Sequence, residues 1–148
     1  MNTIEQIDSD LTAALKARHN AAVLTLRGIK TVLANAEIAN NRQAVSEEIA
    51  VKLLRSEVKK RNEAAALYVQ GGRSELAEKE IAEIAIIKKY LPAELSEDSI
   101  RAAVTQVISD SGAGGPQDTG KVMGLVMAKL AGQADGSVVS KLVKEALV

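Results

Sequence analysis

Apolar residues recur along the chain at the three- and four-residue spacing of an amphipathic α-helix. The pattern starts at Thr3 and Gln6, which match a capping box, the polar pair that marks a helix N-terminus. Four apolar residues follow at helical spacing: Ile4, Ile7, Leu11 and Leu15. The N-terminal segment is therefore predicted to form a helix with one buried face.

Three further helices are predicted before residue 92, at about 21–39, 46–70 and 74–90. Asn40-Asn41 ends the first of these, and Gly71-Gly72 ends the second because glycine readily adopts the conformation that closes a helix. Their expected inward-facing residues are Ala22, Leu26, Ile29 and Leu33, then Ile49, Leu53 and Val58, then Leu76, Ile84 and Ile87.

Pro92 ends the fourth helix, because the residue before a proline is pushed out of the helical region. The chain carries many charges before this proline and is richer in glycine and small residues after it. We therefore expect an N-terminal helical domain of about four helices, 1–92, and a small C-terminal three-helix bundle, 93–148. No segment favours a strand, so the predicted fold class is all-α.

Three short helices are predicted in the C-terminal part. Ser96 caps the first, Asp118 caps the second, which runs to Leu130, and Asp135 or Ser137 caps the third. SGAGGPQ and GQADGS form the intervening loops. The expected apolar faces are Ile100, Val104, Val107 and Ile108, then Val122, Met123, Val126, Met127 and Leu130, then Val138, Val139, Leu142, Val143 and Ala146.

The composition limits which side chains can form the core and which kinds of partner the chain can bind. Hydrophobic residues make up 47% of the chain, yet Tyr68 and Tyr90 are the only aromatic residues, which suits closely packed helices better than a sheet. Lys plus Arg and Asp plus Glu number 19 each, so a nonspecific nucleic-acid coat is disfavoured while a local basic patch remains open. Cysteine is absent, which excludes disulfides and thiolate sites. With no secretory signal or membrane-length apolar run, we expect a soluble, cytoplasmic protein.

The sequence GPQDTGKV, residues 115–122, has the outline of a phosphate-binding loop. That motif needs a Ser or Thr after the lysine to bind magnesium, and Val122 stands at this position. It also needs a strand before the loop, whereas the preceding residues are predicted to be helical. We therefore reject the nucleotide-binding interpretation.

Gly120, Gly124 and Ala128 recur every four residues on the predicted helix 118–130. Glycine inside a helix costs up to about 1 kcal/mol relative to alanine, so this strip of small residues needs an explanation. From packing alone, the favoured explanation is a neighbouring helix that approaches closely. The alternative is a nucleic-acid backbone or a partner surface, with Lys121 and Lys129 flanking the strip.

The run DTGKVMGLVMAKLAGQADGSVVSKLV, residues 118–143, resembles the C-terminal signature of the YqeY family. It also resembles the tail domain of the B subunit of tRNA-dependent amidotransferase, the GatB/YqeY domain. LTLRGIK (24–30), EVKKRNEAA (57–65) and IIKKYLPAELSED (86–98) agree with the family in the same order. The resemblance therefore covers essentially the whole chain.

The resemblance implies an all-helical fold and a link to tRNA or to transamidation, because the related tail of the amidotransferase helps to hold the tRNA. This chain resembles the tail without the catalytic body. No segment matches the ATP-using phosphorylation site or a Ser-Lys amidase core. His19, the only histidine, lies in a polar turn and is expected to be solvated. We therefore expect no catalytic residue, no cofactor and no metal.

Two groups of basic residues remain as candidates. Lys52, Arg55 and Lys59 share a face of the third helix with Glu48 and Glu63 at four-residue spacing, which is typical of a salt-bridged, solvated surface. In the second helix, two basic residues occupy one turn, where they either line the rim of the core or form a small secondary anion surface: Arg27 and Lys30.

The leading hypothesis is a noncatalytic tRNA-associated module. Lys121, Lys129 and Lys141 would meet phosphates, which position RNA without reading bases, while Gly120 and Gly124 would allow close approach. The scarcity of aromatic residues argues against single-strand recognition. One alternative is a protein-interaction adaptor for an amidotransferase or another tRNA enzyme. Another is a participant in carbon–nitrogen ligation with glutamine as amido donor. No membrane or DNA partner is expected.

Overall fold

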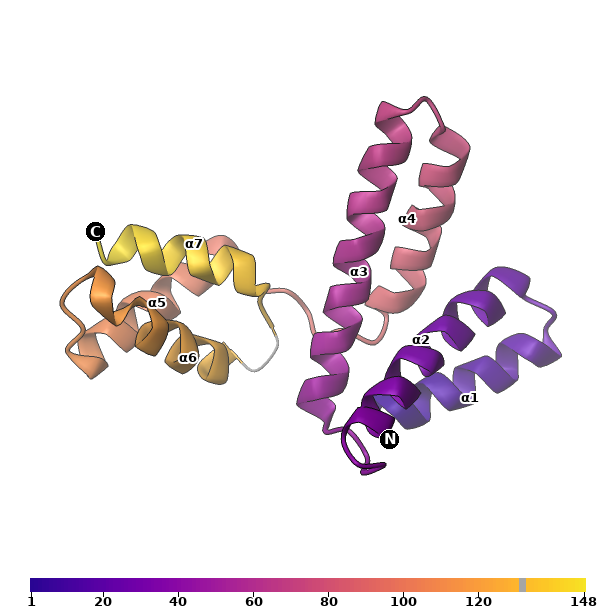
Figure 1. Cartoon of the computed structure of the whole chain (residues 1–148), viewed down its shortest axis with the longest axis horizontal. Helices are drawn as coiled ribbons and strands as arrows, with labels where there is room; N and C mark the ends of the chain where they lie inside the picture. Colours follow the sequence, from indigo (N-terminus) through magenta and orange to yellow (C-terminus); the bar gives the residue numbers. More distant parts are fainter. Residues whose placement is uncertain (131–132) are drawn as a thin grey trace. The chain divides into compact units, whose positions relative to one another are not determined.

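The computed structural model describes residues 1–130 and 133–148, and within them every regular element is helical (Figure 1). This confirms the predicted all-α class. The elements are α1 (Thr3–Lys16), α2 (Asn20–Ala39), α3 (Glu47–Gln70), α4 (Ser74–Lys88), α5 (Glu97–Ser111), the 3-10 helix η1 (Pro116–Asp118), α6 (Thr119–Leu130) and α7 (Gly136–Ala146). The chain forms two compact units, 1–91 and 92–148.

The cap of α1 lies one residue earlier than predicted. The Asn2 side chain accepts a hydrogen bond from the Glu5 N–H, and the Glu5 carboxylate accepts one from the Asn2 N–H, each at 2.9 Å. Thr3 instead donates from its backbone N–H to the Glu47 carboxylate at 3.1 Å, which ties the start of α1 to the start of α3. The capping box is therefore formed by Asn2 and Glu5, and not by Thr3 and Gln6, which match the same sequence pattern one residue later.

Unit 1–91 consists of two helical hairpins, α1 with α2 and α3 with α4, which share one core. The left-handed backbone of Gly72, with φ of 72°, closes the turn between α3 and α4. The core residues are Ile7, Leu26, Ile29, Leu33, Val45, Ala50, Leu54, Val58, Ile84 and Ile87.

The buried face of α3 differs from the predicted one. Ile49 was expected inside, but 44% of it is exposed, and Leu53 is only half-buried. The buried row is Ala50, Leu54 and Val58 at four-residue spacing. A small alanine at the first position hid this row behind the larger Ile49 in the sequence pattern.

Unit 92–148 packs α5, α6 and α7 against one another in every pairing. Ser96 caps α5 through the Ser99 N–H, and Gly112 ends this helix with a left-handed φ of 69°. Asp135 caps α7 by accepting from the Ser137 N–H at 2.8 Å. The core residues are Ile100, Val104, Val107, Val122, Val126, Leu130, Ala134, Val139, Leu142, Val143 and Leu147.

Three details of this unit differ from expectation. Asp118 does not cap α6; its carboxylate accepts from the Gly114 N–H at 3.0 Å and closes the preceding loop. Ala146 is exposed, and Leu147 completes the buried face of α7 in its place. The predicted turn GQADGS lies in part outside the described residues, since Gly132 is not among them.

Candidate functional site

The strip of small residues on α6 faces outward. Val122 and Val126 bury the opposite side of the helix against the core of the unit, so Gly120 and Gly124 are exposed. A Cβ atom added at either glycine would meet no heavy atom of the described residues within 4 Å. Within the described part of unit 92–148 no neighbouring helix packs on the strip, contrary to the expectation, because α6 contacts α5 and α7 through its apolar arc.

A second row runs beside the strip, formed by Lys121, Leu125 and Lys129 at four-residue spacing. All three are exposed, Leu125 to 45%. Both lysines are without an ion pair among the described residues. Eight residues of helix place the two Cα atoms about 12 Å apart along the axis. This row and the strip Gly120, Gly124 and Ala128 together make the outer face of α6.

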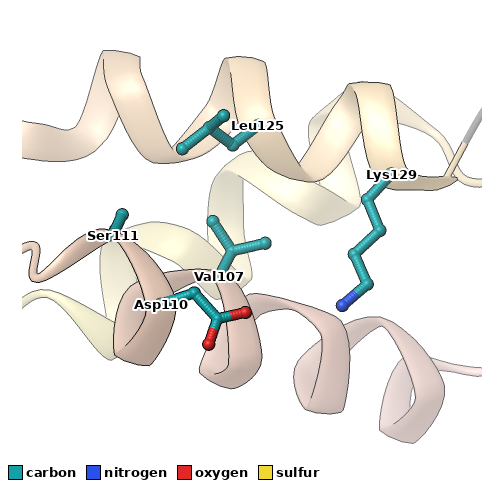
Figure 2. A pocket seen from close by; sticks show the side chains of 5 residues that line it. All are labelled: Val107, Asp110, Ser111, Leu125 and Lys129. Carbon is teal, nitrogen blue, oxygen red and sulfur yellow. The ribbon is translucent and has the colours of Figure 1, made fainter.

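A shallow hollow of about 330 Å³ borders this face where α6 meets α5 (Figure 2). Its lining residues are Val107, Asp110 and Ser111 of α5 and Leu125 and Lys129 of α6. Figure 2 shows the Lys129 side chain extending toward α5. The Asp110 carboxylate accepts a hydrogen bond from Gln106 at 2.9 Å and forms no ion pair with Lys129. The hollow is therefore lined both by the apolar side chains of Val107 and Leu125 and by Lys129, which has no carboxylate partner among the described residues.

Lys141 does not adjoin this row. It is exposed on α7, where Val139 and Val143 are buried. The side of α6 that approaches α7 carries Met127, whose methyl group lies 3.9 Å from a Cβ built on Gly136. Met127 is two residues from Leu125, about 200° around the helix, so the lysine row borders α5 and not α7. The structure thus brings Lys121 and Lys129 together and leaves Lys141 on another face.

The secondary anion surface is only partly available. Arg27 and Lys30 are both exposed on α2, in unit 1–91. The Lys30 ammonium lies 2.6 Å from the Asp8 carboxylate of α1, which neutralises one of the two charges. This pair is therefore a weaker anion site than the two unpaired lysines of α6.

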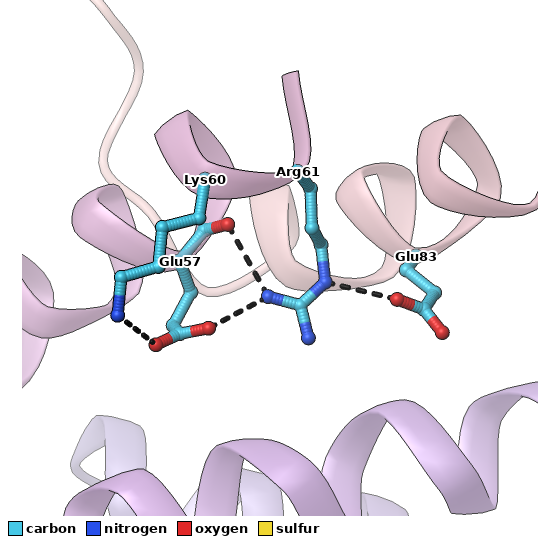
Figure 3. A network of polar contacts seen from close by, with 4 residues as sticks. All are labelled: Glu57, Lys60, Arg61 and Glu83. Atoms are coloured by element: carbon cyan, nitrogen blue, oxygen red, sulfur yellow. Dashed lines mark hydrogen bonds and ion pairs between the residues drawn. The ribbon is translucent and has the colours of Figure 1, made fainter. Parts of the chain in front are cut away.

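An ion-pair cluster of low exposure joins α3 and α4, and the sequence analysis did not identify it. Arg61 of α3 donates to Glu57 at 2.8 Å and to Glu83 of α4 at 3.0 Å, and Lys60 adds an outer contact to Glu57 at 3.4 Å (Figure 3). Burial alone would lower the pKa of Arg61, but the hydrogen bonds to Glu57 and Glu83 outweigh it and raise that pKa. The four-residue spacing of Glu57 and Arg61 was visible in the sequence, whereas Glu83 comes from another helix. The cluster fastens α3 to α4.

Of the other charged candidates, Arg55 departs from the predicted solvated face of α3, because it is half-buried. Lys52 and Lys59 are exposed on α3. His19 is exposed at the start of α2, and its side chain makes no capping hydrogen bond. Within residues 1–130 and 133–148, no three His, Asp or Glu side chains are grouped so as to hold a metal ion.

The loop at Gly115 is preceded by helix α5, which confirms that it lacks the strand of a phosphate-binding loop. None of the described helices combines the length and the apolar character that crossing a membrane requires.

Comparison with known proteins identifies relatives over most of the chain. The family model described as Yqey-like protein matches residues 4–147. The protein named "Altered inheritance of mitochondria protein 41, mitochondrial" from Kluyveromyces lactis is 29% identical over 110 residues, covering 72% of this chain and 59% of that protein. Its namesake from Pyrenophora tritici-repentis is 25% identical over 146 residues, covering 96% and 79%. The chain thus spans less than two thirds of the length of the Kluyveromyces protein.

Proposed function

The chain belongs to the YqeY family, and from this premise we propose that it is a noncatalytic module that contacts folded tRNA through the outer face of α6. The observation that carries the proposal is the uncovered strip of Gly120 and Gly124 beside two unpaired lysines, Lys121 and Lys129. A glycine surface lets a phosphate backbone approach the helix closely, and lysines at its edge supply the charge.

The chemistry of this face favours backbone contact over base reading. Phosphate contacts fix the position of a nucleic acid without carrying sequence information. Stacking on single-stranded bases needs aromatic side chains, and both tyrosines of the chain lie in unit 1–91. Together with the sequence resemblance to the amidotransferase tail, this supports a folded RNA as the ligand.

The test is tRNA binding across a salt series. Lys121→Ala combined with Lys129→Ala should weaken binding and make the slope of log K against log salt shallower by roughly 1 to 2 units, close to one per lost phosphate contact. Lys52→Ala combined with Lys59→Ala removes the same charge from an exposed face of α3 and should leave the slope unchanged. If both double variants lost tRNA affinity equally, the effect would come from the net charge of the chain and not from the outer face of α6.

A large side chain introduced on the glycine strip provides a second, independent test of the proposal. Gly124→Leu keeps every charge and should weaken tRNA binding with little change in salt slope. Gly28→Leu is the matched control, because Gly28 is also an exposed helical glycine with open space around it, on α2. Binding that is unaffected by Gly124→Leu would exclude close approach at the strip.

An adaptor role is the second candidate, and the hollow beside α6 favours it. Leu125 and Val107 offer apolar surface there, and an apolar side chain of a tRNA amidotransferase or another aminoacyl-tRNA enzyme would fit against them. Absence of tRNA binding by the wild-type chain at low salt, together with copurification of such an enzyme that Leu125→Glu abolishes, would favour the adaptor over the RNA module.

A direct part in glutamine-dependent carbon–nitrogen ligation is the third candidate. The noncatalytic proposal requires that the purified chain neither hydrolyses ATP nor releases ammonia from glutamine. Turnover that follows the protein through successive columns and disappears in Lys121→Ala would overturn it.

A cytoplasmic location belongs to the same proposal. The two named relatives carry the word mitochondrial in their names, which describes those proteins. Fractionation of cells that produce the full chain, with detection in the cytoplasmic or an organellar fraction, distinguishes the locations.

A further inference from the structure

A cleft of about 270 Å³ lies within unit 1–91, between α1, the start of α2 and the end of α4. It is separate from the outer face of α6, and no role proposed above uses it. Its lining residues are Asp10, Ala13, His19, Ala22, Leu26, Ile86, Lys89 and Tyr90.

The Asp10 carboxylate of the cleft already accepts two hydrogen bonds from within the chain. One oxygen of the Asp10 carboxylate accepts from the Tyr90 hydroxyl at 2.6 Å, and the other accepts from the Gln6 amide at 2.9 Å. Burial and this bond to Asp10 raise the pKa of Tyr90, so the hydroxyl keeps its proton and remains a donor. Asp10 and Tyr90 therefore satisfy each other across α1 and the end of α4.

The nitrogen donors of the cleft are not occupied. Neither the His19 ring nor the Lys89 ammonium makes a side-chain hydrogen bond or ion pair with any other residue of the described chain. The Lys89 ammonium therefore offers unoccupied donors and a positive charge, and the His19 ring can add a further donor, which favours a ligand with an anionic acceptor.

The floor of the cleft is apolar. Leu26 is 2% exposed, Ile86 is half-buried, and Ala13 and Ala22 leave space that larger side chains would fill. Water occupies about 30 Å³ per molecule in the liquid, so the cleft has room for a ligand of roughly nine or ten non-hydrogen atoms. The cleft lies just below the range of about 300–1,000 Å³ that is typical of small-molecule pockets, so only a small ligand fits.

We propose that this cleft binds a small amphipathic carboxylate, with its head at Lys89 and His19 and its short apolar stem over Leu26 and Ile86. A monoanion suits the site better than a phosphate dianion, because the Asp10 carboxylate stands in the same cleft and repels a second negative charge more strongly. The site requires no RNA contact, so it stands or falls independently of the function proposed for α6.

The probes are three six-carbon molecules that differ only in the head group: hexanoate, 1-hexanol and hexylammonium. Each is titrated into the full chain and followed by the amide NMR signals of residues 19–22 and 89–90. Hexanoate should bind with millimolar affinity, 1-hexanol roughly fivefold more weakly, and hexylammonium most weakly. Hexylammonium binding as tightly as hexanoate, or no shifts at these amides with hexanoate, would overturn the proposal.

Matched variants locate the site. Lys89→Gln should weaken hexanoate binding roughly fivefold to the level of hexanol, whereas Lys88→Gln, an exposed neighbour outside the lining, should not. Ala13→Leu should block the cleft, and Ala21→Leu, on the exposed side of α2, should leave binding intact. Equal effects of the members of either pair would place any binding elsewhere.

Discussion

Gly124 and Gly28 are single residues whose replacement isolates the backbone cost of glycine. Both lie inside helices, and neither has a heavy atom within 4 Å of the position of an added Cβ in the described structure. Gly124→Ala and Gly28→Ala should therefore each raise the free energy of unfolding by about 0.5–1 kcal/mol, because alanine restricts the unfolded chain more. Chemical denaturation of the two variants and the wild type measures this.

The same experiment checks the orientation of the strip. If a helix or another copy covered Gly124 in solution, its alanine variant would lose stability while Gly28→Ala still gained it. A gain in both variants combined with impaired tRNA binding by Gly124→Leu would indicate that Gly124 is kept for contact and not for packing.

Tyr90 gives a pH-dependent prediction at the residue scale. Burial, and then its hydrogen bond to Asp10, raise the pKa of Tyr90 above the ordinary value of 10.0. The unfolded chain loses this proton near pH 10 while the folded chain retains it. The stability that Tyr90 contributes is therefore complete below pH 10 and is lost as the pH rises from there toward the raised pKa.

The measurement is the denaturation midpoint at a series of alkaline pH values from about pH 9 upward. Tyr90→Phe has no ionisable hydroxyl at this position and should show a smaller alkaline decline than the wild type. Tyr68→Phe retains Tyr90 and serves as the control. Identical alkaline profiles for Tyr90→Phe and the wild type would show that the Asp10 bond does not hold this proton.

At the scale of elements, the ion pairs of Arg61 with Glu57 and Glu83 stabilise the packing of α3 against α4. The Arg61 side chain is 16% exposed and lies between the carboxylates of Glu57 and Glu83. Its removal would leave two enclosed carboxylates facing each other. Arg61→Ala should thus lower the free energy of unfolding by about 1–3 kcal/mol, between the values for exposed and fully buried pairs.

Lys60→Ala is the control for this prediction, because Lys60 also contacts Glu57 but is 68% exposed. It should change stability by less than about 1 kcal/mol. Thermal unfolding of both variants, at low and high salt, separates the two contacts. A loss for Lys60→Ala as large as that for Arg61→Ala would show that the cluster acts as surface charge only.

Helices were predictable as elements because their existence depends on local periodicity. Their exact caps were less predictable, since Asn2 with Glu5 and Thr3 with Gln6 meet the same pattern one residue apart. The face of α3 was misread because Ala50 carries little hydrophobic weight beside Ile49. In both cases the choice between neighbouring registers is made by packing, which the local pattern does not contain.

The candidate site was predictable in part for the same reason. Helical spacing alone placed Lys121 and Lys129 beside Gly124 on one helix. Whether another element covers that face depends on how α6 meets α5 and α7, and packing arguments gave the wrong answer. The Asp8 partner of Lys30 likewise comes from another helix.

At the scale of the whole molecule, the two compact units have separate cores. No residue of 1–91 belongs to the core cluster of 92–148 among the described residues. A fragment of this size lies in the range of about 55–65 residues, where many domains fold alone with low stability. We therefore expect residues 92–148 to form a helical, cooperatively unfolding domain, measured by circular dichroism and thermal unfolding.

This fragment also tests where the proposed function resides. It contains the outer face of α6, so it should bind tRNA with the salt slope of the full chain, while fragment 1–91 should bind weakly or not at all. Val126→Asp places a charge in the core of the fragment and should abolish both helicity and binding, which links the two readouts. A fragment 92–148 that folds but has lost tRNA binding, with binding retained by 1–91, would move the RNA contact to the other unit. In that case Arg27, which makes no ion pair among the described residues, becomes the first cation to replace.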